Sequence, residues 1–143
     1  MAFQILYGIN FAQSADSNFL SRTFSNFTGQ EERFTDQTMS FAWELITGVW
    51  EVKEDLDAVI KKFSQHWRLE RIAKIELTIL RLALFEMLYR SDVPIKVAIN
   101  EGIELSKKFG DEKSRGFVNG ILDSSAKSLN TGELKTKVQK SSS

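Results

Sequence analysis

Cysteine is absent from this 143-residue sequence, and histidine and proline each occur only once. Without cysteine, the chain can form neither a disulfide framework nor a thiolate metal site. The single histidine, His66, argues against a His-rich metal site and against a Ser-His-Asp triad. With only eight glycines and one proline, the chain lacks the frequent turn residues of a many-stranded sheet. This scarcity favours helices.

Long apolar runs are also missing. The sequence has no stretch of about 18 apolar residues and no recognisable secretory signal, so we expect a cytoplasmic protein with no membrane partner. The length predicts a single helical domain over residues 1–129, able to bury about two-thirds of its unfolded surface. Residues 130–143 have little to bury and are expected to form a disordered polar tail.

The formal net charge is zero, but the charges are unevenly spread. Residues 1–60 contain three Lys or Arg against nine Asp or Glu, whereas residues 105–143 contain eight against four. A basic second half suggests a highly charged partner. Solvation of the tail explains three of these cations equally well: Lys135, Lys137 and Lys140. Four of the other five cluster around one expected loop: Lys107, Lys108, Lys113 and Arg115.

Apolar residues at spacings of three and four predict helices along most of the chain. Between Ile72 and Leu88 the apolar positions extend nearly all round, which is typical of a buried central helix. Pro94 can begin a helix but not continue one, and Gly110 is expected to cap the same helix at its end. The whole pattern predicts an all-α bundle of six or seven helices. The expected helices cover residues 1–11, 34–47, 52–67, 72–88, 94–109 and about 114–129.

No group of residues indicates catalysis. Glu101 and Glu104 share a helix face, but beside Lys107 and Lys108 they are better interpreted as surface charge. Gly110 and Gly116 are too sparse for a phosphate-binding loop and follow no strand. We therefore expect no enzymatic activity, no metal and no cofactor.

Nucleic-acid binding fits the residues better. Basic side chains lie beside Phe109 and Phe117, and single-stranded RNA is often held by a basic groove with aromatic stacking. The alternative is that both rings belong to the core. We expect Phe109 to be a core residue, and for Phe117 both interpretations stay open.

Several motifs in fixed order resemble the NusB family. The resemblance covers residues 1–129, is most specific over residues 81–123, and at residues 14–65 is limited to the helix pattern. The first helix contributes Ala2, Gln4 and Leu6-Tyr7. The remaining motifs are Arg81-Leu82-Ala83-Leu84-Phe85-Glu86, Asp92-Val93-Pro94, Val97-Ala98-Ile99-Asn100-Glu101, Glu104-Leu105, Lys108-Phe109-Gly110, Ser114 and Phe117-Val118-Asn119-Gly120-Ile121-Leu122-Asp123.

This resemblance implies an all-helical fold of two packed three-helix bundles. It also implies a bacterial transcription antitermination factor that pairs with NusE, a ribosomal small-subunit protein. The pair would bind boxA-type single-stranded RNA in ribosomal RNA operon transcripts and join the RNA polymerase antitermination complex. By position, Tyr7 and Glu76 match the NusE interface. The residues that match the RNA-facing region are Gln4, Lys113, Arg115 and Phe117.

One departure from the family pattern concerns the start of the chain. Family members usually carry an arginine-rich segment before the Ala-x-Gln-x-Leu-Tyr helix, but here Lys and Arg are absent before Arg22. We expect either a truncated start, which the uncapped first helix favours, or weaker RNA binding. Two other functions stay open: an RNA-binding domain related to those of rRNA cytosine methyltransferases, and a homodimeric helical module.

Overall fold

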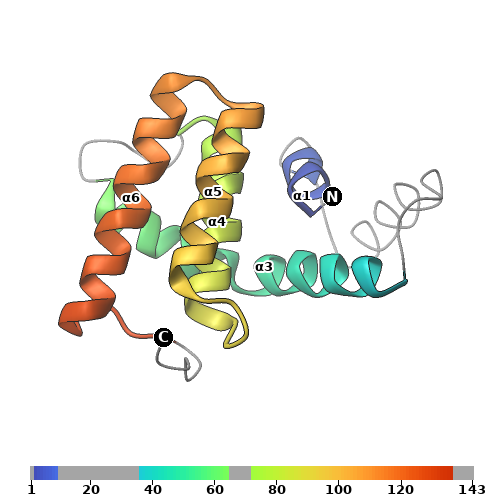
Figure 1. The fold of residues 1–143 in the computed structure, drawn as a ribbon, viewed down its shortest axis with the longest axis horizontal. Helices are drawn as coiled ribbons and strands as arrows, with labels where there is room; N and C mark the ends of the chain where they lie inside the picture. Colours follow the sequence, from blue (N-terminus) through green and yellow to red (C-terminus); the bar gives the residue numbers. More distant parts are fainter. Residues whose placement is uncertain (1, 10–35, 65–71, 137–143) are drawn as a thin grey trace. The chain divides into compact units, whose positions relative to one another are not determined.

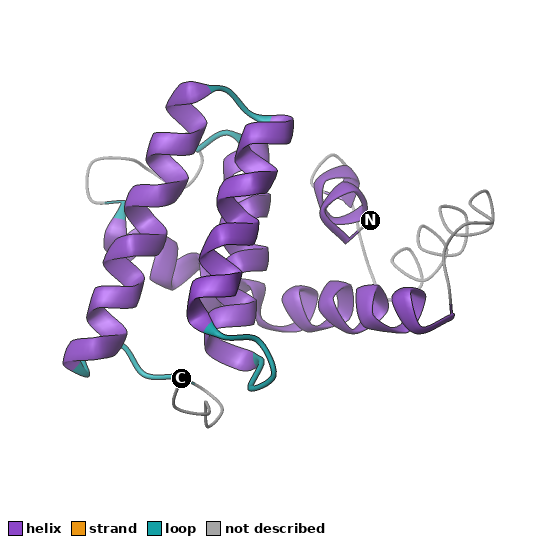
Figure 2. Cartoon of the chain, viewed as in Figure 1, coloured by secondary structure: helices purple, strands orange, loops and turns teal. Residues whose placement is uncertain are grey.

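The structure, a computed structural model, describes residues 2–9, 36–64 and 72–136, and the regular elements in these ranges are all helices (Figures 1 and 2). This confirms the predicted all-α class. None of the helices in these ranges is long and apolar enough to cross a membrane. The helices are α1 (Ala2–Ile9), α3 (Asp36–Phe63), α4 (Lys74–Tyr89), α5 (Ile95–Phe109) and α6 (Glu112–Thr131).

The chain divides into two compact units, residues 1–51 and 52–143. The boundary falls inside α3, where Val52 departs from helical geometry with φ −112° and ψ 17°. The sequence predicted two helices meeting near this point. The break is where it was expected, but the chain bends at one residue instead of leaving the helix. His66 and Trp67, at the expected end of the second helix, lie outside the described residues.

In the second unit, α4 packs against α5 and α6, and these two helices also pack against each other (Figure 1). From Thr78 to Leu88 every residue of α4 except Arg81 is buried, as expected for a central helix. Arg81 instead extends to α3. Its Nε donates to Asp57 Oδ1 and its Nη2 to Asp57 Oδ2, each at 2.7 Å, a bidentate ion pair that connects the second half of α3 to α4.

The inner face of α5 carries only small buried residues: Ala98, Gly102 and Ser106. A Cβ atom on Gly102 would lie 2.9 Å from Leu122 Cδ1 and 3.3 Å from Ala83 Cβ. The three helices therefore approach closely because this face is nearly free of side chains. The larger apolar residues of α5 lie outside this inner face and are half-buried or exposed. Val97, for example, is 42% exposed.

Helix α6 ends two residues beyond the predicted boundary. Gly132 adopts the left-handed conformation (φ 84°), and its N–H donates to the Leu129 carbonyl. The Leu134 N–H then donates to the Ser128 carbonyl at 3.0 Å. These bonds order the chain as far as Leu134. The predicted single domain and disordered tail stay predictions, and residues 137–143 lie outside the described ranges.

Candidate nucleic-acid interface

The start of α6 is fixed by a side-chain cap. Asp111 Oδ1 accepts the Ser114 N–H at 2.8 Å, and this bond is the main cause that lowers the pKa of the Asp111 carboxyl. The sequence predicted a polar loop and the start of a helix between Asp111 and Ser114. In the structure the helix already begins at Glu112, because the Asp111 cap satisfies an amide that a loop would leave free. Lys113 and Arg115 thus lie on a rigid first turn.

Four cations occupy this end of the α4–α6 group, which we call the basic corner: Lys107, Lys108, Lys113 and Arg115. Lys113 is exposed and Arg115 half-buried, and within the described part of the chain neither side chain forms a hydrogen bond or an ion pair. Lys107 forms an exposed 3.3 Å ion pair with Glu104, and Lys108 Nζ lies 5.4 Å from the centre of the Phe109 ring. Lys113 and Arg115 are therefore the most available for phosphate groups.

The two phenylalanines near the basic corner are both half-buried. Phe109 was expected in the core, but its ring is only partly buried. It is the last residue of α5, and the Lys108 ammonium lies over its ring. Phe117 lies on the second turn of α6. A half-buried ring is anchored by its neighbours and still offers part of a face for base stacking.

Glu76 lies in the first turn of α4 and is half-buried. Its Oε1 accepts a hydrogen bond from the Ser114 hydroxyl at 2.9 Å. The sequence indicated that Glu76 points away from the apolar row of its helix. The structure adds that it points toward the start of α6, so the residue expected to contact a protein lies beside the cations expected to contact RNA.

The other two predicted site residues lie on α1, in the first unit. Gln4 is exposed, and Tyr7 is half-buried with its ring stacked on Phe3 at a centroid distance of 5.9 Å. The structure brings together four of the six predicted site residues at the basic corner. Gln4 and Tyr7 share one short helix, α1, in the first unit.

The sequence interpretation overlooked Glu86, a carboxyl group that is only 4% exposed on α4. Burial is the main cause that raises the pKa of Glu86 to about 8, and the charge and hydrogen bond of Glu101 raise it further. Arg90 acts in the opposite direction, and Asp92 adds to the rise. The signal in the sequence was a carboxyl group within the otherwise apolar segment from Leu82 to Leu88, which predicts that this carboxyl is buried.

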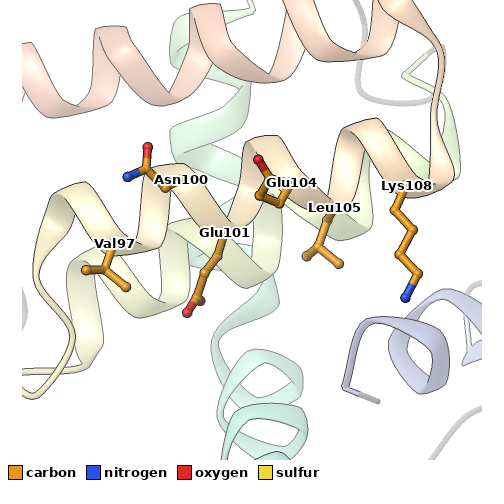
Figure 3. A pocket seen from close by; sticks show the side chains of 6 residues that line it. All are labelled: Val97, Asn100, Glu101, Glu104, Leu105 and Lys108. Atoms are coloured by element: carbon orange, nitrogen blue, oxygen red, sulfur yellow. The ribbon is translucent and has the colours of Figure 1, made fainter.

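A groove follows the stripe of α5 that includes Glu101 (Figure 3). Its described lining consists of Val97, Asn100, Glu101, Glu104, Leu105 and Lys108. Two apolar, two acidic, one amide and one basic side chain line it, without the convergent polar groups of an active site. In the described ranges, no group of three or more His, Asp or Glu side chains could hold a metal ion.

Comparisons with known proteins agree with this geometry. A family model described as the NusB family matches residues 1–127. The transcription antitermination protein NusB of Oleidesulfovibrio alaskensis is 55% identical over 138 residues, covering 96% of this chain and 90% of its own length. The corresponding protein of Myxococcus xanthus is 41% identical over 129 residues, covering 90% of this chain and 91% of its own length.

Solved structures show the same fold. T. maritima NusB superposes with a TM-score of 0.77 at 32% identity, covering 93% of this chain and 92% of its own. A structure of antitermination factors NusB and NusE in complex with dsRNA has a TM-score of 0.71 at 23% identity, covering 86% of this chain and 88% of its own. This comparison shows a likeness of fold. With the match over residues 1–127, these relatives show that the chain belongs to the NusB family.

Proposed function

We propose that this chain is a transcription antitermination factor that pairs with NusE and binds boxA-type RNA in transcripts of ribosomal RNA operons. It acts in the cytoplasm as an adaptor within the RNA polymerase antitermination complex, by binding and not by catalysis. The observation that carries the proposal is the basic corner, where four cations lie near a half-buried ring, Phe117, and a half-buried carboxylate, Glu76. A solved relative of the same fold contains NusB, NusE and dsRNA.

On the RNA side, Lys113 and Arg115 pair with phosphate groups while Phe117 stacks on an unpaired base. Stacking on an aromatic side chain contributes about 1–3 kcal/mol per base. Gln4 on α1 is an exposed amide that can donate to and accept from a base edge. Phosphate contacts supply affinity, and the stacked base favours a single strand over a duplex.

On the protein side, Glu76 and Tyr7 contact NusE. In the described part of the chain, Glu76 Oε2 has no hydrogen-bond partner, so this oxygen can accept a cationic group of a basic ribosomal protein. Tyr7 offers a ring already held by Phe3, so that little conformational freedom is lost on contact.

Two measurements test this function. The chain should co-elute with a NusE protein in gel filtration, and the pair should bind a boxA RNA more tightly than a scrambled RNA of equal length. Charge reversal at Glu76 (Glu76→Lys) should weaken NusE binding by at least about tenfold, because a half-buried carboxylate contact is replaced by repulsion.

The matched control is Glu133→Lys, which reverses an exposed carboxylate beyond the end of α6 and should leave NusE affinity unchanged. Melting temperatures of both variants separate loss of contact from loss of fold. Failure to co-elute with NusE would refute the proposed function. Equal NusE affinity of Glu76→Lys and the wild-type chain would remove Glu76 from the interface.

A further inference from the structure

The groove on α5, called here the α5 groove, combines aliphatic and acidic side chains in a fixed order. Figure 3 shows Val97, Glu101 and Leu105 pointing to the same side of the helix, four residues apart, with Lys108 beyond them. The groove has a volume of about 540 Å³. Val97 is exposed and Leu105 is half-buried, so both sides of Glu101 offer aliphatic surface to a partner.

The carboxylate in the middle of this row is held from behind by a core residue. Glu86 on α4 is only 4% exposed, and it shares a hydrogen bond with Glu101 across the contact between α4 and α5. Because burial raises the pKa of Glu86 to about 8, Glu86 carries the proton of this bond near neutral pH. The negative charge of the pair then lies on Glu101, the exposed member.

Nearby cations leave this negative charge available. Arg90 forms a bidentate ion pair with Asp92, with distances of 3.0 and 2.9 Å, and Lys107 pairs with Glu104. Within the described residues, no cation forms an ion pair with Glu101. The Glu101 carboxylate is therefore charged and already held in one direction, so little conformational freedom is lost when a partner binds it.

We propose that the α5 groove is a third binding surface of this adaptor, and that it takes one helix of a protein partner other than NusE. That helix carries a Lys or Arg between two aliphatic residues on one face. Glu86 is a positioning residue, because it holds Glu101 without contacting the partner. The inference goes beyond the proposed function, in which Glu76 and Tyr7 contact NusE and neither residue lines the groove.

The spacing and the charge of the row select this partner. From Val97 to Leu105 the row is about 12 Å long, or roughly two helical turns, which matches an aliphatic–basic–aliphatic row on a second helix. Two carboxylates, Glu101 and Glu104, face one ammonium group, and that group lies over the Phe109 ring. This net negative charge repels RNA phosphates and attracts a basic helix.

The test uses a designed helical peptide of about 18 residues, with leucine and lysine alternating along one face. A second peptide with glutamate in place of lysine is the reference. Fluorescence anisotropy with the full chain should show the lysine peptide binding at least about tenfold more tightly, because only its charge complements Glu101 and Glu104. Equal binding of the two peptides would overturn the proposal.

Variants locate the peptide on the chain. Glu101→Gln/Glu104→Gln should weaken binding of the lysine peptide by about fivefold or more, because two ion pairs are lost. The matched control is Glu51→Gln/Glu54→Gln, two exposed carboxylates with the same spacing on α3, which should keep the wild-type affinity. An equal loss in the control would reduce the interaction to general charge attraction and overturn the proposal.

Two variants of Glu86 test the positioning role. Glu86→Gln keeps a neutral donor for Glu101 and should bind the lysine peptide as the wild-type chain does. Glu86→Leu has no donor and should bind it about threefold more weakly, because the Glu101 side chain is then free to rotate. Melting temperatures show whether each variant is folded. Equal peptide affinities of the two folded variants would remove the positioning role from Glu86.

Repeating the peptide titration with saturating NusE separates this surface from the proposed function. We expect the peptide affinity to stay unchanged. Displacement of the peptide by NusE would assign the α5 groove to the NusE interface and overturn the inference. A chain that bound the peptide but not NusE would refute the proposed function alone and would support the α5 groove as an independent surface.

Discussion

Glu86 is a single carboxyl group that makes the stability of the fold depend on pH. It lies in the buried half of α4, and the Glu101 carboxyl faces it from α5. Burial followed by the charge of Glu101 raises its pKa from 4.5 to about 8. Near neutral pH this carboxyl is therefore protonated and donates its hydrogen bond to Glu101.

The wild-type protein should lose stability as the pH rises from about 4.5 to about 8. Over this range the native state holds a proton that the unfolded chain has released, so the free energy of unfolding falls with pH. The contribution is fully present below pH 4.5 and lost above about 8. Its size is on the order of a few kcal/mol. Urea unfolding at several pH values measures the slope.

Two variants serve as references for this measurement. Glu86→Gln has no carboxyl to titrate and should flatten the slope across the same range. Glu104→Gln, which changes an exposed carboxylate of α5 paired with Lys107, should keep the wild-type slope. A slope that survives in Glu86→Gln would assign the pH dependence to another group.

At the scale of single residues, the sequence indicated candidate site residues but not the side chains that they contact. Lys113, Arg115 and Phe117 were identified because they follow one another along the chain. The bond from Ser114 to Glu76 joins residues 38 positions apart. Only the packing of α6 against α4 brings them together, and a single sequence does not show which distant residues come into contact.

Helix α5 packs closely against its neighbours because its inner face has no large side chains. Ala98, Gly102 and Ser106 form its entire buried set, and Gly102 allows Leu122 and Ala83 to approach. Glycine inside a helix costs about 1 kcal/mol relative to alanine. Here that cost is offset by the contacts that α4 and α6 gain across α5.

Exchanging glycines on neighbouring helices should have opposite effects. Gly102→Val should lower the free energy of unfolding by about 1–3 kcal/mol, because its side chain would overlap Leu122 and Ala83. Gly120→Ala on α6, whose Cβ would meet nothing within 4 Å, should raise it by about 0.5–1 kcal/mol. Chemical denaturation measures both. Equal effects would show that helix propensity, not packing, decides at these positions.

Elements with explicit stop signals were predicted almost to the residue. Pro94 and Gly110 delimit the predicted fifth helix, and α5 runs from Ile95 to Phe109. Residues 34–67 contain no proline, so the pattern could not distinguish a loop from a bend. Helix α3 passes through Val52 with only a local departure from helical geometry. Periodicity reports which face is apolar, but not whether the axis continues straight.

Across the whole molecule, opposite charges cancel, and the net charge is zero. Long-range attraction to RNA therefore cannot come from the overall charge and requires a local group of cations, and under the proposed function that group is the basic corner. The first 60 positions carry nine acidic residues against three basic ones, so the net negative charge lies away in sequence from the cations expected to bind phosphate. RNA binding should then depend on few phosphate contacts and on salt in proportion to their number.

The double variant Lys113→Ala/Arg115→Ala should bind boxA RNA more weakly and with a shallower salt dependence. For a single strand, each lost phosphate contact reduces the log–log slope by about 0.7, so the two together should reduce it by about 1.4. Lys127→Ala is the control, because this cation lies farther along α6 and pairs with Asp123 at 3.1 Å. A slope unchanged in the double variant would place the RNA elsewhere on the surface.

The bare inner face of α5 also constrains how this sequence can evolve. Gly102 has almost no acceptable replacement, because a larger side chain would overlap Leu122 and Ala83, and Ala98 and Ser106 are buried on the same face. The opposite face, with exposed Val97, can change without disturbing the core. Descendants of this chain can therefore alter what α5 presents to a partner while inheriting its interior unchanged. New binding preferences can arise there without new folds.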